Sequence, residues 1–479
     1  MTFKLSMSLD ARLTHSAALQ VIGKAFSTVL GLIAVILMMR FLSLEQFGWY
    51  ATASGFLQFV GIASDFGFII VTANMMSEPE HDKTKLLNTI FSWRIITALI
   101  IQIPAPLIYF AFSHHGPTNA AIGVLAIAYF TTAINQVFIG YFQSQHKNYL
   151  QIVGEILNRI GMIVGMYFVV FNRSGFIPVV LVVSLSSLIY TLFLWSRCPQ
   201  IRFGMDKKVS HDLFHRMWPT ALAIIFNAFY LQGDRVILPW YTNAEQVGLY
   251  GSAYRVIDIV TQTVAMIMGI MAPLLTYHWS RKLFEKFKGY YQLSFDLTAL
   301  FLFPAIAGIM ALATPIMHFI DAKYDAAGPI LMALIWSVAG IWLGMTFGYI
   351  ILTLKKQRQA LLVYFSDAII SVIAYFIFIP RFGVWGAVGV SVFSELYAGL
   401  FLFALCSYYT RIIPHATTFL KILLASFLMG LGVYYLRNHL LFAILGGIGI
   451  YAGLVILFRI ISPTALKQLF SKKTQQIID

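Results

Sequence analysis

Four ionisable residues stand inside two long apolar stretches that meet at a short polar turn. Asp234 and Arg235 precede the turn, and Arg255 and Asp258 follow it. A charge at the centre of a membrane-spanning helix costs about 2.5–3.5 kcal/mol on insertion scales, so such residues face protein or water and are functional candidates. Asn227 precedes Asp234 by two helical turns, on the same face. Because guanidinium groups offer planar, bidentate hydrogen bonds, the two arginines suit a diphosphate or an acidic sugar.

A rival interpretation is that each of these arginines is neutralised by its neighbouring aspartate and binds no ligand. Similar alternatives hold for three other charged residues. Lys24 lies about seven residues inside the first apolar stretch, where its side chain reaches either a cavity or the membrane interface. Glu155 and Arg159 have the i, i+4 spacing of an intrahelical ion pair, which would make them a structural bridge.

Three further acids lie in apolar stretches and have no obvious local partner. Asp65 follows a polar repeat with a seven-residue period and fits a helix-packing or turn role better than proton coupling. Asp367 and Glu395 are candidates for ion coupling or charge compensation, because a low-dielectric site favours the protonated form of a carboxyl group.

The composition excludes a soluble globular protein. The chain of 479 residues is 59% hydrophobic and 11% charged, with a mean hydropathy of +0.80. Its apolar runs are about 20 residues long, which matches a hydrocarbon core roughly 30 Å thick. We predict an all-α integral membrane protein with about fourteen spans, near residues 17–39, 47–75, 86–112, 119–142, 149–171, 175–196, 217–240, 247–277, 291–319, 327–354, 359–379, 384–409, 415–436 and 440–461.

The net charge of +14 is interpreted as topological and not as a sign of nucleic-acid binding. Lys and Arg gather in alternate loops, which the positive-inside rule assigns to the cytoplasm. Both termini are then cytoplasmic, and the first apolar stretch is expected to be an uncleaved helix. Few cations fall on the predicted outer side, namely Arg40, Arg173, Lys323, Arg381 and Arg437.

Two short echoes indicate that the chain is duplicated. Residues 45–53 (EQFGWYATA) match residues 245–253 (EQVGLYGSA), and residues 168–175 (FVVFNRSG) match residues 376–383 (FIFIPRFG). Each pair occupies equivalent positions in two sets of six spans, which predicts a parallel repeat that alternates access by rocking one half against the other. The expected domains are a six-helix bundle at 1–200, a basic cytoplasmic linker at 201–216, a second bundle at 217–409, and two extra helices with a basic tail at 410–479.

Several loose motifs, in a fixed order, carry a family resemblance. They are residues 40–50 (RFLSLEQFGWY), the Asp-Phe-Gly at Asp65, Asn227 followed by Asp234-Arg235, residues 247–253 (VGLYGSA) and residues 382–387 (FGVWGA). With these motifs the chain resembles the Wzx-type polysaccharide repeat-unit flippases. Their superfamily also contains multidrug and toxin extruders and lipid II flippases.

The resemblance implies a multi-pass protein of the bacterial inner membrane that is not an enzyme. It would carry an undecaprenyl-diphosphate-linked oligosaccharide from the cytoplasmic to the periplasmic leaflet, for O-antigen, lipopolysaccharide or capsule. The substrate would bind in a cationic cavity between the two bundles, to which we assign Arg235, Arg255, Lys24 and Asn227. A proton or sodium gradient would supply the energy, and the sequence agrees in lacking a GxxxxGK[ST] phosphate loop. Membrane lipids, a polysaccharide polymerase and glycosyltransferases are the expected partners, with no nucleic acid and no cofactor.

Two other functions compete with this one. A drug or small-cation exporter of the same fold would favour acids and aromatic residues over arginines in its site. A membrane glycan polymerase or ligase would need a sizeable outer loop, and the predicted outer loops are too short to hold an independent catalytic site. The two cysteines, Cys198 and Cys406, both fall near predicted cytoplasmic helix ends and indicate neither a disulfide framework nor a metal site.

Overall fold

The computed structural model describes the backbone of residues 9–64, 68, 75, 82–112, 116–145, 147–198 and 201–460. Side chains are described from residue 23 onward, apart from residues 63, 112, 216, 218–225, 227 and 230. The predicted site residues Asp65 and Asn227 therefore lie outside the described side chains.

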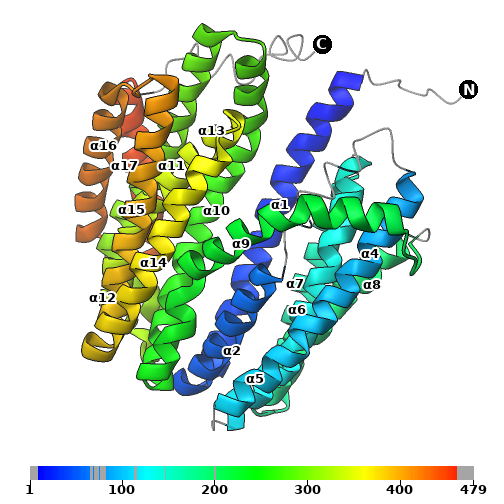
Figure 1. Ribbon diagram of the computed structural model, residues 1–479. Helices are drawn as coiled ribbons and strands as arrows, with labels where there is room; N and C mark the ends of the chain where they lie inside the picture. The colour runs from blue at the N-terminus through cyan, green and yellow to red at the C-terminus, as the bar shows by residue number, and fades with distance from the viewer. Residues whose placement is uncertain are drawn as a thin grey trace, which may run out of the picture. The chain divides into compact units, whose positions relative to one another are not determined.

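All regular secondary structure in the described residues is helical, as predicted (Figure 1). The helices are α1 (Leu9–Phe41), α2 (Leu44–Ala63), α4 (Lys83–Gln102), α5 (Pro104–Phe112), α6 (Gly116–Ser144), α7 (Tyr149–Phe171), α8 (Phe176–Ser196), α9 (Lys207–Tyr241), α10 (Ala244–Ser280), α11 (Phe284–Ile320), the short η1 (Ala322–Tyr324), α12 (Ala327–Leu334), α13 (Ser337–Thr353), α14 (Gln357–Phe382), α15 (Val384–Thr410), α16 (Ala416–Tyr435) and α17 (Leu440–Leu457).

Twelve helical segments of the described chain are long and apolar enough to cross a membrane. They coincide with twelve of the fourteen predicted spans, so the chain is a multi-pass membrane protein. The other two predictions, 47–75 and 217–240, fall on α2 with the residues after it and on α9, where part of the chain is not described. The count of fourteen and the side of the termini stay predictions.

Two of the spans are built from a pair of helices. The predicted span 86–112 is divided into α4 and α5 at Ile103, because Pro104 cannot donate to the preceding turn. The span 327–354 is divided into α12 and α13 at Ile335–Trp336, where no proline stands. In contrast, α11 continues through Pro304 and Pro315.

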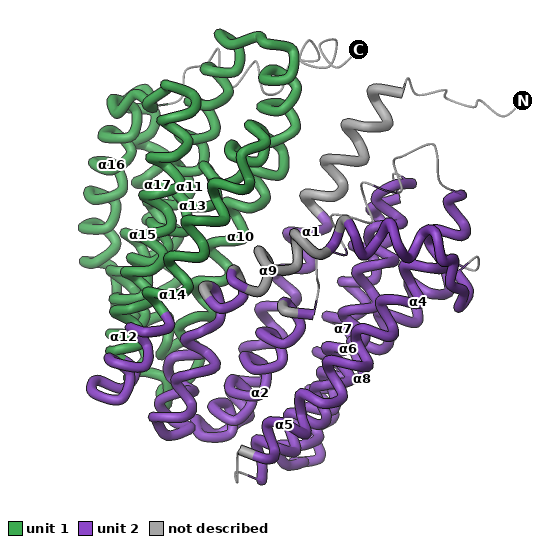
Figure 2. The backbone as a smooth tube through the Cα atoms, viewed as in Figure 1, with its two compact units in different colours: residues 1–12, 252–371, 385–479 green, residues 13–251, 372–384 purple. Residues whose placement is uncertain are grey.

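The chain forms two compact units, which Figure 2 colours separately. Unit 1 contains residues 1–12, 252–371 and 385–479, and unit 2 contains residues 13–251 and 372–384. The boundaries fall inside helices, since α10 and α14 each contribute to both units. The predicted division into two six-helix bundles rests on sequence repetition and not on contacts, so the two units do not test it. It stays a prediction.

Unit 2 has its core among α4, α6 and α8, and the predicted linker is part of that core. Ile201, Val209 and Leu213 are buried in it. The linker backbone is also fastened to α4, because Arg202 N donates to Asn88 Oδ1 at 2.9 Å, and Gly204 N and Asp206 N donate to hydroxyls of the same helix. The linker is thus a docked segment, and its second half is already the first part of α9.

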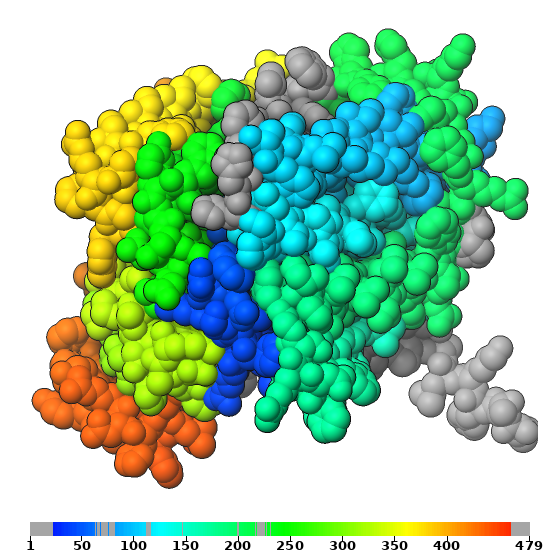
Figure 3. Space-filling model, turned by 90° about the horizontal axis from the view of Figure 1, so that it is seen from below, coloured from blue at the N-terminus to red at the C-terminus, as the bar shows by residue number. Residues whose placement is uncertain are grey.

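Unit 1 is organised around α11, which packs against α12, α13, α16 and α17. The indole of Trp342 stacks on Phe419 with ring centroids 5.4 Å apart and donates to Thr298 Oγ1 at 2.8 Å, which joins α13, α16 and α11. In the space-filling view the side chains of α16 and α17 gather beside those of α11 (Figure 3). The two extra C-terminal helices are therefore packed on the second half of the chain.

The first repeated motif, residues 45–53 and 245–253, which we call the duplicated motif, lies where α2 and α10 begin, and its residues up to 251 belong to unit 2. A methyl group at Gly48 would overlap the carbonyl of Ala244, and a methyl group at Gly248 would lie 2.5 Å from the carbonyl oxygen of Leu44. Gly48 thus meets Ala244, and Gly248 meets Leu44. At the sequence offset of 200, Gly48 is equivalent to Gly248 and Leu44 is equivalent to Ala244, so a local two-fold axis relates the two contacts. A Cβ at Gly251 would be 3.0 Å from Cβ of Ala51, its own equivalent. The two copies of the duplicated motif thus contact each other through their backbones.

Both copies of the motif also start their helix in the same way. Ser43 caps α2, with its Oγ accepting from Gln46 N at 3.1 Å and the Gln46 side chain accepting from Ser43 N. At the equivalent position Asn243 Oδ1 accepts from Gln246 N at 2.9 Å. The side-chain caps fix where each helix starts, and so they fix which residue meets the partner helix.

The Gly48 contact predicts a position-specific cost. Gly48→Ala should lower the unfolding free energy by about 1–3 kcal/mol, because the added methyl group has no space against Ala244. The measurement is the apparent Tm of the purified protein in detergent. Gly389→Ala is the control, since a methyl group there meets open space and should be neutral or stabilising. Equal Tm values for both variants would contradict the close contact.

Candidate functional site

A charged cluster joins α1 and α7 within unit 2. Lys24 Nζ lies 2.7 Å from Glu155 Oε2, in an ion pair whose side chains are 43% and 18% exposed. Gln151 Nε2 donates to the other carboxylate oxygen at 3.1 Å. Lys24 of the first predicted span thus contacts Glu155 of the fifth. Glu155 pairs with a lysine from another helix, and the predicted intrahelical pair with Arg159 is not the one that forms.

Arg159 follows Glu155 by one helical turn and keeps its charge available. Within the described part of the chain no carboxylate forms an ion pair with it; its Nη1 contacts the Met162 sulfur at 3.9 Å. The guanidinium lies over Gly31 of α1, where a methyl group would come within 3.0 Å of Nε. Glycine at this position leaves room for the arginine between the two helices.

Tyr190 of α8 completes this cluster, which we call the α1–α7 site and define as Lys24, Gln151, Glu155, Arg159 and Tyr190. The Tyr190 ring packs over Gly154, and its hydroxyl is buried without a hydrogen-bond partner in the structure. The site therefore holds two cations, one carboxylate and one unsatisfied hydroxyl, which leaves an excess of positive charge.

The residues before the polar turn make two separate contacts in unit 2. Arg235 Nη1 donates to Gln58 Oε1 of α2 at 3.2 Å, close to the point where Gly55 lets α9 approach α2. Asp234 is buried and accepts from the Tyr250 hydroxyl at 2.7 Å. Tyr250 belongs to the duplicated motif, so the motif provides a hydrogen-bond donor to Asp234 as well as the contact between α2 and α10.

The residues after the turn belong to unit 1. Arg255 and Asp258 are half-buried and lie one helical turn apart on α10. The principal predicted pair, Arg235 and Arg255, is therefore divided between the two units, and each member is described within its own unit. Its joint role in binding stays a prediction.

Asp367 and Glu395 both belong to unit 1, on α14 and α15. Asp367 is fully buried and accepts from the Ser394 hydroxyl at 2.9 and 3.0 Å. Glu395 is the next residue on α15 and is half-buried. Asp367 on α14 thus contacts a serine of α15, which the sequence spacing alone did not indicate.

Arg94 is an arginine with a structural role, because its guanidinium is held by hydrogen bonds within the fold. It is 1% exposed and donates to the carbonyl oxygens of Ser64 and Ala133 at 2.7 and 3.1 Å, and to Gln136 Oε1. Its guanidinium also lies 5.2 Å from the centroid of the Phe68 ring. Arg94 ties the end of α2 to α4 and α6.

Both cysteines are free and buried. Cys198 lies beyond the end of α8, where burial raises the pKa of its thiol to about 11, so the group is a thiol at neutral pH. No group of His, Cys, Asp and Glu among the described residues could hold a metal ion.

The helix arrangement and a family model identify the class of membrane protein to which the chain belongs. The chain belongs to the polysaccharide biosynthesis protein family, whose model matches residues 37–323. Its fold is that of a flippase titled "Lipid II flippase MurJ, inward closed conformation", with 16% identity, a TM-score of 0.76, and coverage of 92% of this chain and 99% of that one. This confirms the family and fold that the motifs indicated.

Two other solved structures have the same fold. One is an inward-facing multidrug resistance MATE family transporter of the MOP superfamily, with 13% identity, a TM-score of 0.65, and coverage of 79% of this chain and 98% of that one. The other is a MOP superfamily transporter from Pyrococcus furiosus, with 15% identity, a TM-score of 0.57, and coverage of 86% and 99%. None of the curated protein sequences compared with this chain matches it.

The pair between α1 and α7 can be tested by charge exchange. Lys24→Glu and Glu155→Lys should each lower the unfolding free energy by about 1–3 kcal/mol, because each places like charges at hydrogen-bond distance. The double variant restores an opposite pair and should recover most of that loss. Apparent Tm values of the four proteins give the coupling energy, and additive losses would show that the two side chains do not interact.

Proposed function

We propose that this protein is a flippase that moves an undecaprenyl-diphosphate-linked oligosaccharide from the cytoplasmic to the outer leaflet of the bacterial inner membrane. Membership of a polysaccharide biosynthesis family and a fold shared with a lipid II flippase support a lipid-linked substrate. The product would supply O-antigen, lipopolysaccharide or capsule, and a polymerase and glycosyltransferases would act after and before it.

The observation that carries the proposal is the excess positive charge of the α1–α7 site. A lone cation inside a membrane protein is costly unless something compensates it. Arg159 has no carboxylate partner among the described residues, whereas Arg94 is held by carbonyl groups. A diphosphate is the compensating group that the proposed substrate brings, and a guanidinium can bind it through two parallel hydrogen bonds.

The Lys24–Glu155 pair gives this binding a coupling step. When a diphosphate reaches the site, Lys24 can exchange its bond to Glu155 for a bond to phosphate. Glu155 then keeps only Gln151 as a donor, and taking up a proton relieves its uncompensated charge. Release of the diphosphate on the other side would restore the pair and return the proton, so one proton would cross with each substrate and the translocation rate would depend on an imposed pH gradient.

The other predicted residues have places in the same scheme. Arg235, Arg255 and Asn227 would extend the cationic path along which the diphosphate moves. Asp234 and Asp258 would compensate these arginines while no substrate is present. Asp367 and Glu395 form the alternative coupling site, which would take a proton or a sodium ion.

Loss of the Arg159 charge should impair translocation. At equal membrane abundance, Arg159→Gln should lower the rate at which lipid-linked units reach the outer leaflet by about tenfold or more, since charge-assisted hydrogen bonds contribute about 1.5–3 kcal/mol. Arg159→Lys should lose less. The measurement is surface polymer together with the leaflet distribution of the lipid-linked unit, in cells that lack the chromosomal gene.

Arg173→Gln is the matched control, because Arg173 follows the same helix and is exposed at its predicted outer end. It should behave as wild type. Units that appear on the outside but stay unpolymerised in the deletion strain would oppose the flippase and favour a polymerase. Normal glycan with increased drug sensitivity would favour an exporter of small cations.

Glu155 should connect translocation to the pH gradient. In vesicles that contain the purified protein and a fluorescent polyprenyl-diphosphate sugar, wild type should respond to an imposed pH gradient, and Glu155→Gln should not. Asp367→Asn, which changes the other buried carboxyl group, should keep the response. If Glu155→Gln kept the response and Asp367→Asn lost it, the coupling group would be Asp367 and not Glu155.

A further inference from the structure

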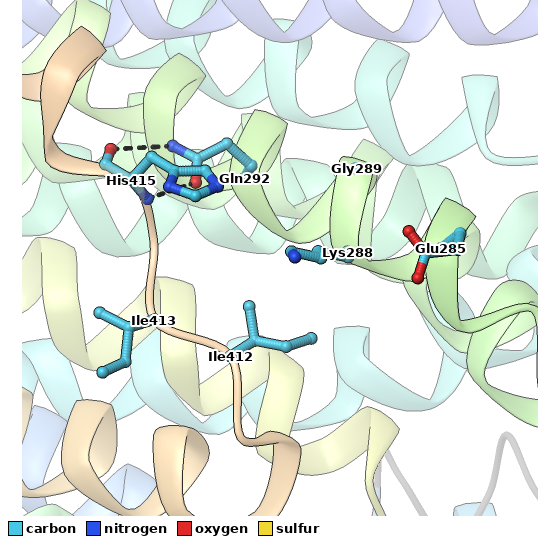
Figure 4. A pocket seen from close by; sticks show the side chains of 7 residues that line it. All are labelled: Glu285, Lys288, Gly289, Gln292, Ile412, Ile413 and His415. Carbon is cyan, nitrogen blue, oxygen red and sulfur yellow. Dashed lines mark hydrogen bonds between the residues drawn. The ribbon is translucent and has the colours of Figure 1, made fainter.

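A pocket of about 280 Å³ opens in unit 1 between the first turns of α11 and the segment that connects α15 to α16. Figure 4 shows its seven lining residues: Glu285, Lys288, Gly289, Gln292, Ile412, Ile413 and His415. Both walls, the first turns of α11 and the α15–α16 segment, fall in parts of the chain that the charge pattern predicts to face the cytoplasm, which would place the pocket at the level of the inner lipid headgroups. It contains no residue of the α1–α7 site.

One wall of the pocket is rigidly built. Gln292 Oε1 accepts from His415 N at 2.7 Å, and Gln292 Nε2 donates to His415 O at 3.2 Å. The same Nε2 donates to Asp296, and the Tyr291 hydroxyl donates to Ile412 O at 3.3 Å. These bonds hold the connecting segment on α11 and leave the Gln292 amide no free polar atom for a ligand.

The charged residues of the pocket remain available. Glu285 and Lys288 lie one helical turn apart, a spacing at which opposite charges commonly pair. Yet neither belongs to an ion pair in the described part of the chain. Both side chains line the pocket and are exposed. The pocket therefore presents one anionic and one cationic group to the same small space.

The remaining surface of the pocket is apolar. Ile412 and Ile413 lie opposite the charged face of α11, and Ile413 is 71% exposed (Figure 4). Leu420, one turn into α16, the helix that follows this segment, is also exposed, at 60%. An occupant thus needs two opposite charges at one end and an apolar continuation at the other.

The size of the pocket limits the occupant further. At about 30 Å³ for each water molecule, it holds roughly nine waters. Sites for drug-sized ligands begin at about 300 Å³, so an oligosaccharide does not fit, whereas a single headgroup does. We propose that this pocket binds the phosphoethanolamine headgroup of a phospholipid in the cytoplasmic leaflet.

In this arrangement Lys288 donates to the phosphate of the lipid, and the lipid's primary ammonium donates to Glu285. The acyl chains leave the pocket over Ile413 and follow α16. A phosphatidylglycerol would satisfy Lys288 and leave Glu285 facing a phosphate. A phosphatidylcholine would bring a cation without N–H groups to Glu285. The pair of opposite charges therefore favours the amine-bearing headgroup over both.

The test uses the delipidated full-length protein in detergent and native mass spectrometry with dioleoyl phospholipids. Phosphatidylethanolamine should be retained roughly tenfold better than phosphatidylcholine or phosphatidylglycerol, as expected for one charge-assisted hydrogen bond. Retention should fall stepwise along the N-methyl and N,N-dimethyl forms. Glu285→Gln should abolish the preference over phosphatidylcholine, and Lys288→Gln should weaken retention of phosphatidylethanolamine itself.

Lys286→Gln is the matched control, since Lys286 is an exposed residue of the same turn that does not line the pocket. It should retain phosphatidylethanolamine as wild type does, and apparent Tm values check that all three variants are folded. Equal retention of phosphatidylglycerol and phosphatidylethanolamine would overturn the proposal in favour of a simple anion site. Loss of retention in the control to the same extent would assign the effect to general surface charge and also overturn it. No readout depends on the transported substrate.

Discussion

The close approach of α2 and α10 is the constraint on which much of unit 2 depends. Two helix backbones can touch only where a residue at the contact lacks a side chain, and Gly48 and Gly248 supply such a residue on each helix. The caps at Ser43 and Asn243 set the register, so that each glycine meets the first residue of the other helix. The two copies of the duplicated motif thereby form a two-fold contact between the first turns of α2 and α10.

Much of the fold follows from hydropathy and proline placement, because both act locally. The break at Pro104 removes one backbone donor and can be predicted from the residue itself. The break at Ile335–Trp336 has no such signal, since it depends on what packs around the helix. The docking of the linker could not be predicted either, because its partners, Asn88, Thr89 and Ser92, lie far away in the sequence.

The candidate site shows the same limit. Helical spacing places Glu155 and Arg159 on one face of α7, and Lys24 on a polar face of α1. It does not show that Lys24 reaches Glu155, and it favoured the wrong partner for this carboxylate. Tyr190 and Ser394 carry no signal of their own, since a tyrosine or serine in an apolar helix is common. Tyr250 did carry a sequence signal, because Tyr50 is its equivalent in the other copy of the motif. The repetition did not reveal that the Tyr250 hydroxyl donates to Asp234.

Partners, more than position, separate structural cations from candidate ligand-binding cations in this chain. Among the described residues, Arg94 is the most deeply buried lysine or arginine, yet carbonyl groups at the end of α2 and on α6 accept hydrogen bonds from its guanidinium, so a ligand would have to displace packing as well as solvent. Arg159 is less buried, has the space above Gly31, and shares its cluster with a carboxylate that already has a cation of its own. Under the proposed function, a diphosphate would bind Arg159 without breaking any bond that holds two helices together, and it would then compete for Lys24. At the α1–α7 site added negative charge would thus meet a guanidinium that no described carboxylate pairs with.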